Sequence, residues 1–179
     1  MSRPTVIVIA LVLSAASLVL GDTPISAQVT PPAGEKIGQV SFPVSCAPAM
    51  QKPFERAVAL LHSFWYLESA KAFAAIAQAD PSCGMAYWGV ALSQWTQIWS
   101  PPPPAALKRG VEAMDKAKAA GAKTDRERDY IAAADLFFKD ADKLDHPTRA
   151  AAYARAMEQV YQRYPQDREA AIFYALALQ

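Results

Sequence analysis

The chain has 179 residues, of which 53% are hydrophobic and 20% charged, with 18 Lys and Arg against 17 Asp and Glu. This composition excludes an intrinsically disordered protein, which combines low hydrophobicity with high net charge. A formal net charge of +1 gives no electrostatic basis for binding nucleic acid or an anionic membrane. The length favours one domain. Seven glycines, with few β-branched residues beyond the first 30 positions, predict an all-α fold.

Residues 1–27 have the pattern of a secretory signal peptide. Arg3 precedes an apolar run of about 15 residues that ends at Leu20, and small residues suit cleavage after Ala27 or, as a second choice, after Gly21. This run is shorter than the roughly 20 apolar residues that a membrane span requires, which favours a cleaved signal peptide. The alternative interpretation is an uncleaved signal anchor. No later stretch is apolar enough to span a membrane, so we expect a protein that is exported, periplasmic or secreted.

Residues 28–48 are rich in Pro and Gly and predict an irregular lead-in to a helical domain over residues 49–179. Apolar residues at helical spacing, separated by Pro, Gly and capping residues, predict seven helices in this domain. They cover Met50–Ser63, Leu67–Ala79, Met85–Trp95, Ala105–Ala120, a helix from a capping box at Thr124 and Glu127 to Lys139, Pro147–Arg163, and a helix capped by Asp167 that runs to Leu178.

Pairs of helices with short connectors can form an internal repeat, and a shift of 34 residues places Ala57 over Ala91. One unit, from Met50 to Cys83, has Ala57 at a small site, Phe73 at an aromatic site and a closing Pro81. The next unit begins at Gly84, with Tyr87 at the first aromatic site and Ala91 at the small site. A later unit begins at Arg168 and has Ala175 at the small site. On these residues the chain resembles the tetratricopeptide repeat family, and LHSFWYLESAKAFAAIAQADPSCGMAYWGVAL is similar to exported bacterial repeat proteins of unknown role. The chain departs from the pattern at Pro53, which stands at the first aromatic site, and in lengthened middle units. The alternative is a generic helical bundle.

The resemblance implies a right-handed α-solenoid in which the first helix of each pair lines a concave groove. It assigns the residues of this concave binding surface as Phe54, Val58, Leu61, His62, Met85, Trp88, Leu92 and Trp95. Trp88 and Trp95, seven residues apart, are expected to share one helix face. Such a groove would bind an extended peptide or an amphipathic helix of a protein partner. The alternative is that these aromatic side chains pack against residues 28–48 or between repeats.

Cys46 and Cys83 are the two cysteines of the chain, and an even number in an exported protein predicts a disulfide. The alternative is a periplasmic protein that handles copper(I) through Cys46, Cys83, Met85, His62 and Met50, because soft sulfur ligands select this ion. These residues form no compact ligand motif. The favoured interpretation therefore includes no metal and no cofactor.

The sequence contains none of the motifs that mark common enzymes. It lacks Gly-x-Ser-x-Gly, His-Glu-x-x-His, a phosphate-binding glycine loop and the Cys-x-x-Cys-His of haem attachment. His62 lies near the C-terminal end of a predicted helix, where a positive charge interacts favourably with the helix dipole. The alternative interpretation is that His62 contacts a ligand. His146 stands in an acidic loop and is expected to be solvated. We therefore predict a non-catalytic binding or scaffold module.

The last helix carries an apolar surface that nothing later in the sequence covers. Its side chains include Ile172, Phe173, Tyr174, Leu176 and Leu178. A terminal repeat normally presents a polar outer face. We therefore expect either that the chain is part of a longer repeat protein or that it self-associates through this helix.

Overall fold

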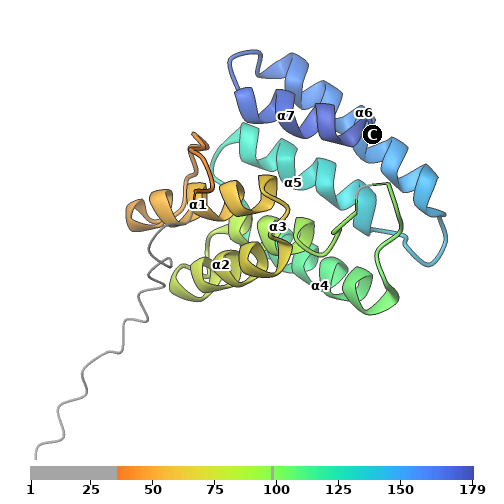
Figure 1. The fold of residues 1–179 in the computed structure, drawn as a ribbon, viewed down its shortest axis with the longest axis horizontal. Helices are drawn as coiled ribbons and strands as arrows, with labels where there is room; N and C mark the ends of the chain where they lie inside the picture. The colour runs from red at the N-terminus through yellow and green to blue at the C-terminus, as the bar shows by residue number, and fades with distance from the viewer. Residues whose placement is uncertain (1–35, 98) are drawn as a thin grey trace, which may run out of the picture. The chain divides into compact units, whose positions relative to one another are not determined.

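The computed structural model describes residues 36–97 and 99–179. The expected signal peptide, residues 1–27, and the first part of the lead-in, residues 28–35, lie outside the described residues. In the part that is described the fold is all-α, and it contains no strand. The elements are η1 (Pro48–Met50), a 3-10 helix, followed by α1 (Gln51–His62), α2 (Tyr66–Ala79), α3 (Gly84–Leu92), α4 (Pro104–Ala120), α5 (Asp125–Phe138), α6 (His146–Arg163) and α7 (Arg168–Ala177) (Figure 1).

Local signals in the sequence account for most helix ends. The Thr124 hydroxyl accepts a hydrogen bond from the Glu127 backbone N–H, and the Glu127 carboxylate accepts one from the Thr124 N–H, as the predicted capping box requires. The carboxylates of Asp145 and Asp167 cap α6 and α7. Helix α4 ends at Gly121, whose φ of +73° lies in the left-handed region that glycine adopts at low cost.

The third helix ends earlier than predicted. Helix α3 ends at Leu92, where the Ser93 hydroxyl donates a hydrogen bond to the Gly89 carbonyl oxygen and the chain turns. The Ser93 N–H still bonds to the Gly89 carbonyl oxygen, but the next two N–H groups, of Gln94 and Trp95, bond three residues back, to Ala91 and Leu92, as in a tightened last turn. Trp95 lies beyond the helix, so the expectation that Trp88 and Trp95 share one helix face is wrong.

Successive helices pack against one another from α1 to α7, because the connections between them are mostly short (Figure 1). Helix α3 also packs against α1 and α5. At the start of α3 the backbone approaches the end of α4 closely: a Cβ on Gly84 would lie 2.0 Å from the Gly121 carbonyl oxygen. Buried side chains from all seven helices join one hydrophobic core. The right-handed solenoid remains a prediction from the resemblance.

None of the described helices is both long enough and apolar enough to cross a membrane.

Candidate functional site

A phenylalanine from the N-terminal segment, residues 36–47, lies at the centre of the core. Phe42 is 0% exposed. Its ring centroid lies 5.3, 5.7, 5.1 and 6.5 Å from those of Phe54, Trp88, Tyr130 and Phe173. These four residues come from α1, α3, α5 and α7, one from each helix. We call the sides of these four helices that surround Phe42 the inner face, and its central part the Phe42 site.

The N-terminal segment lies on the inner face with alternating side chains. Phe42 is buried and Val40 and Val44 are half-buried against the core, whereas Ser41 and Pro43 are exposed. Alternation with period two is the pattern of an extended chain that packs on one side. The segment contains no helix or strand between residues 36 and 47.

Polar side chains of α1 satisfy the backbone of this segment. The Gln51 side chain donates to the Phe42 carbonyl oxygen (2.9 Å) and accepts from the Val44 N–H (3.1 Å). The Glu55 carboxylate accepts from the Phe42 N–H (3.3 Å). Because a buried backbone group without a partner is costly, these bonds fix where the segment lies on α1.

Arg126 covers the outer side of the Phe42 site. Its guanidinium carbon lies 4.3 Å from the Phe42 ring centroid, and its Nη1 donates to the Pro43 carbonyl oxygen (3.0 Å). Its Nε forms an ion pair with Asp167 (2.5 Å), which also accepts from the Tyr130 hydroxyl (2.9 Å). Burial, followed by the charge of Asp167, raises the pKa of Tyr130, so the hydroxyl stays protonated and donates.

Glu127 joins the N-terminal segment to α5. This carboxylate is 1% exposed and accepts from the Ser45 N–H (2.5 Å), the Ser45 hydroxyl and the Thr124 hydroxyl (3.0 Å). The same side chain therefore completes the capping box and fixes the segment.

Replacing Glu127 tests this double role. We expect Glu127→Ala to lower the free energy of unfolding by about 2–3 kcal/mol, because it leaves several part-buried donors without an acceptor. Thr124→Ala, which removes only the cap, is expected to cost about 1 kcal/mol. Urea denaturation of both variants measures the difference. Equal losses would show that the bonds between Glu127 and Ser45 contribute no stability.

The predicted disulfide is present. Cys46 and Cys83 are bonded, with their Cα atoms 4.9 Å apart and 37 positions apart in sequence. The bond connects the end of the N-terminal segment to the start of α3. Together with the contacts of Gln51, Arg126 and Glu127, it fixes the segment to three helices.

The structure divides the eight residues that the sequence assigned to a concave groove into two sets. Phe54, Val58, Met85 and Trp88 are at most 1% exposed, and Phe54 and Trp88 pack against Phe42. These four residues form core rather than open groove, because the N-terminal segment covers this part of the inner face. Packing against the lead-in, the alternative stated from the sequence, is observed for Phe54 and Trp88, while Val58 and Met85 are buried in the same core. The other four residues, Leu61, His62, Leu92 and Trp95, line a pocket.

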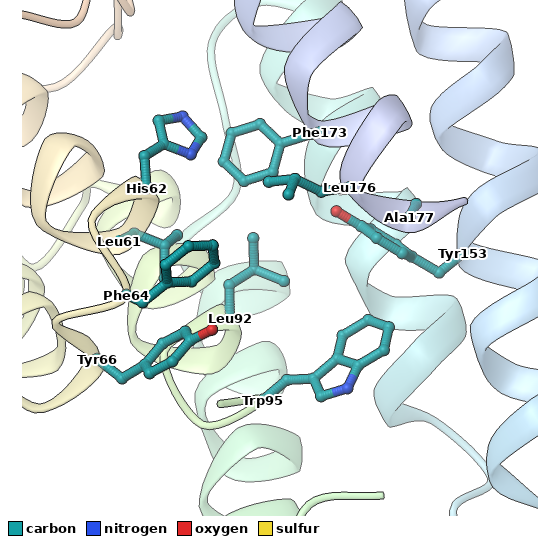
Figure 2. A pocket seen from close by; sticks show the side chains of 10 residues that line it. All are labelled: Leu61, His62, Phe64, Tyr66, Leu92, Trp95, Tyr153, Phe173, Leu176 and Ala177. Carbon is teal, nitrogen blue, oxygen red and sulfur yellow. The ribbon is translucent and has the colours of Figure 1, made fainter. Parts of the chain in front are cut away.

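This pocket opens between the ends of α1, α3 and α7. Figure 2 shows its ten lining side chains, which are Leu61, His62, Phe64, Tyr66, Leu92, Trp95, Tyr153, Phe173, Leu176 and Ala177. Its lining is almost entirely apolar. Its volume of about 50 Å³ is far below the 300–1,000 Å³ typical of sites for cofactors and drug-sized ligands, so it has room for one small side chain. We call it the Tyr153 pocket.

The Tyr153 pocket continues the Phe42 site. Phe173 belongs to both, since its ring packs against Phe42 (6.5 Å) and against His62 (5.0 Å). His62 Nε2 lies 2.7 Å from the carboxylate of Glu169, which is 4% exposed. The histidine at the end of α1 is therefore held by a carboxylate from the first turn of α7.

The rim of the pocket includes a strained residue. Phe64 has a φ of +60°, in the left-handed region that costs a non-glycine residue about 1–2 kcal/mol, and its side chain is 57% exposed. The neighbouring Trp65 and Leu67 are also exposed. Strained backbone persists only where surrounding structure holds it, and it concentrates at binding sites.

The last helix is better covered than expected. Helix α7 packs on α6, and its Ala170 and Phe173 are buried. Ile172 and Leu178 remain 40% and 61% exposed. The inference that this helix lacks a packing partner is therefore wrong for its inner side, while self-association through the outer side stays a prediction.

His146 is half-buried, whereas the sequence predicted a solvated side chain. It is the first residue of α6, and its ring packs against Trp95 (5.8 Å) and Phe137 (5.6 Å) with Nδ1 buried. Desolvation by burial and the positive charge of Arg149 lower its pKa. The ring is half-buried by its aromatic contacts, despite the acidic side chains nearby in sequence.

The residues of the copper alternative do not come together as ligands. The two cysteines are joined in a disulfide and supply no thiolate, and His62 is paired with Glu169. Among residues 36–97 and 99–179, no group of three or more His, Cys, Asp or Glu could hold a metal ion. The observed donors therefore give no support to copper binding.

Several residues of this region were not anticipated from the sequence. Phe42, Glu127 and Tyr153 each hold a position that depends on contacts more than 30 residues away in sequence. Phe42 carried a readable signal, since Val40, Phe42 and Val44 alternate with polar residues or proline. The places of Glu127 and Tyr153 in the site carried no such signal.

No protein-family model, curated protein or solved structure matches this chain. The resemblance to tetratricopeptide repeats therefore rests on the residues quoted from the sequence.

Proposed function

We propose that this chain is an exported, non-catalytic binding module of the tetratricopeptide kind, and that the Tyr153 pocket receives one side chain of an extended peptide from a protein partner. The observation that carries the proposal is the placement of the N-terminal segment. The inner face already holds one extended segment through a buried side chain, and an open apolar pocket continues from that site past Phe173.

The Phe42 site supports this proposal, because it illustrates how the inner face binds an extended polypeptide segment. One apolar side chain enters between alternate helices, while polar side chains such as Gln51 and Arg126 bond to the backbone on either side. Peptide recognition in apolar grooves commonly combines these two elements. The exposed rim residue Phe64 adds apolar surface beside the pocket, where contact with a partner would cover it.

Export is part of the proposal. It is supported by the signal-like residues 1–27 and by the disulfide, because disulfides persist in oxidising compartments such as the periplasm or the extracellular space.

A variant that fills the pocket tests the proposal. Peptides are selected from a displayed random library on the oxidised full-length protein, and their Kd is measured with wild type and Ala177→Phe. Ala177 lines the pocket, so a phenyl ring there occupies its space. We expect Kd to rise at least tenfold, since the ligand loses the burial of one side chain, worth about 1.5–3 kcal/mol.

The matched control is Ala175→Phe, which makes the same change at an exposed position of α7. It should leave Kd unchanged. Selection of no peptide, or of peptides that bind Ala177→Phe as tightly as wild type, would contradict the proposed site.

A further inference from the structure

The hydroxyl of Tyr153 reaches the Tyr153 pocket. Tyr153 is 4% exposed, yet among the described residues its hydroxyl has no hydrogen-bond partner. Figure 2 shows this hydroxyl pointing into the space that the ten side chains surround. Trp95 differs, because its unpartnered indole nitrogen points away from that space.

Unlike Trp95 Nε1, the hydroxyl oxygen is not fully buried, so water in the pocket can bond to it. A ligand that fills the pocket displaces this water and leaves the hydroxyl unpaired unless the ligand supplies a partner. Tyr153 packs edge-on against Trp95 at 5.6 Å, and the two rings pack between α6 and the end of α3. Burial raises the pKa of Tyr153, so its hydroxyl remains protonated and can both donate and accept. The pocket thus combines apolar walls with the Tyr153 hydroxyl, and the Tyr66 hydroxyl also points toward it from the opposite side (Figure 2).

The size of the pocket limits what can meet this hydroxyl. A dry cavity of about 150 Å³ accommodates a benzene ring. The Tyr153 pocket, at about 50 Å³, is closer to a side chain with three heavy atoms beyond Cα. Among side chains of that size, threonine has both a methyl group for the apolar walls and a hydroxyl for Tyr153, whereas its isostere valine has only methyl groups.

We infer that Tyr153 is a specificity-determining residue of the pocket, which selects a ligand side chain that combines a small apolar part with a hydroxyl, as threonine does. This inference rests on the proposed function. A site built to bond a polar atom disfavours the analogue that lacks it, since the group of the site then stays unpaired.

A double-mutant cycle tests the inference. The probes are two peptides, acetyl-Ala-Ala-Thr-Ala-Ala-amide and its valine counterpart, titrated into wild type and Tyr153→Phe. Binding is followed by NMR through the aromatic ring C–H signals of Trp95, which lines the pocket. We expect the ratio of the valine Kd to the threonine Kd to fall about five- to tenfold on Tyr153→Phe, which is the effect of one net hydrogen bond.

Tyr161→Phe provides the matched control, because it removes a hydroxyl from an exposed tyrosine of the same helix outside the pocket. It should leave the ratio unchanged. We also expect Tyr153→Phe to keep the melting temperature of wild type, since the hydroxyl has no partner within the described residues to lose.

The outcomes separate this inference from the proposed function. Peptide binding with the same ratio in wild type and Tyr153→Phe overturns the role of Tyr153 and leaves the peptide site standing. A marked fall in melting temperature also overturns it, because the hydroxyl would then have a structural partner. Absence of any effect of either peptide on the Trp95 signals, at millimolar concentration, contradicts both proposals.

Discussion

Replacing Phe42 by alanine is expected to lower the free energy of unfolding by about 3–5 kcal/mol. The ring is fully buried and packs against one aromatic ring from each of α1, α3, α5 and α7. Its removal leaves a cavity that four separate helices would have to move to fill, so partial collapse recovers little. Urea denaturation followed by far-UV circular dichroism measures the loss.

Phe64→Ala is the control, because it makes the same change from phenylalanine to alanine at an exposed position. Phe64 is 57% exposed, so the same truncation should change the free energy of unfolding by less than about 1 kcal/mol. If Phe42→Ala were no more harmful than Phe64→Ala, the N-terminal segment would not be part of the folded core. The inner face would then be open, and the groove expected from the sequence would be restored at Phe54 and Trp88.

The helices could be predicted because their signals are local. Thr124 and Glu127, which form the capping box of α5, are three residues apart, and Gly121 directly follows the last residue of α4. The two helices also have clear helical periodicity in the sequence. Where the prediction failed, at the end of α3, the backbone changes to bonds three residues back while the apolar pattern continues to Trp95. Periodicity indicates which residues can be helical and does not show where the last turn tightens.

The binding surface could be predicted only in part, because it depends on what covers each residue. The resemblance assigned Trp88 and Leu92 to one concave surface, and both are buried. Nothing local indicates that Phe42, 46 positions before Trp88, fills the space over it. Leu92, although mostly buried, also lines the Tyr153 pocket, whereas Trp88 packs against Phe42.

The Cys46–Cys83 disulfide gives the other large expected effect. We expect the double substitution Cys46→Ser, Cys83→Ser to lower the free energy of unfolding by about 4 kcal/mol, the chain-entropy value for a closed span of 37 residues. Cys83 is 2% exposed, and the bond fixes the end of the segment that carries Phe42. Denaturation of oxidised wild type, reduced wild type and the double variant measures the effect.

The two wild-type states separate the bond from the substitutions. Reduced wild type should lose about as much stability as the double variant, and a reductant should not change the double variant. A difference below about 1 kcal/mol between oxidised and reduced wild type would contradict the prediction. Because Phe42 and Cys46 hold the same segment, their losses should be non-additive: once Phe42→Ala has weakened the packing of the segment, removing the disulfide costs less than it does in wild type. Strict additivity would mean that the disulfide acts on the unfolded chain alone and not on the position of the segment over the inner face.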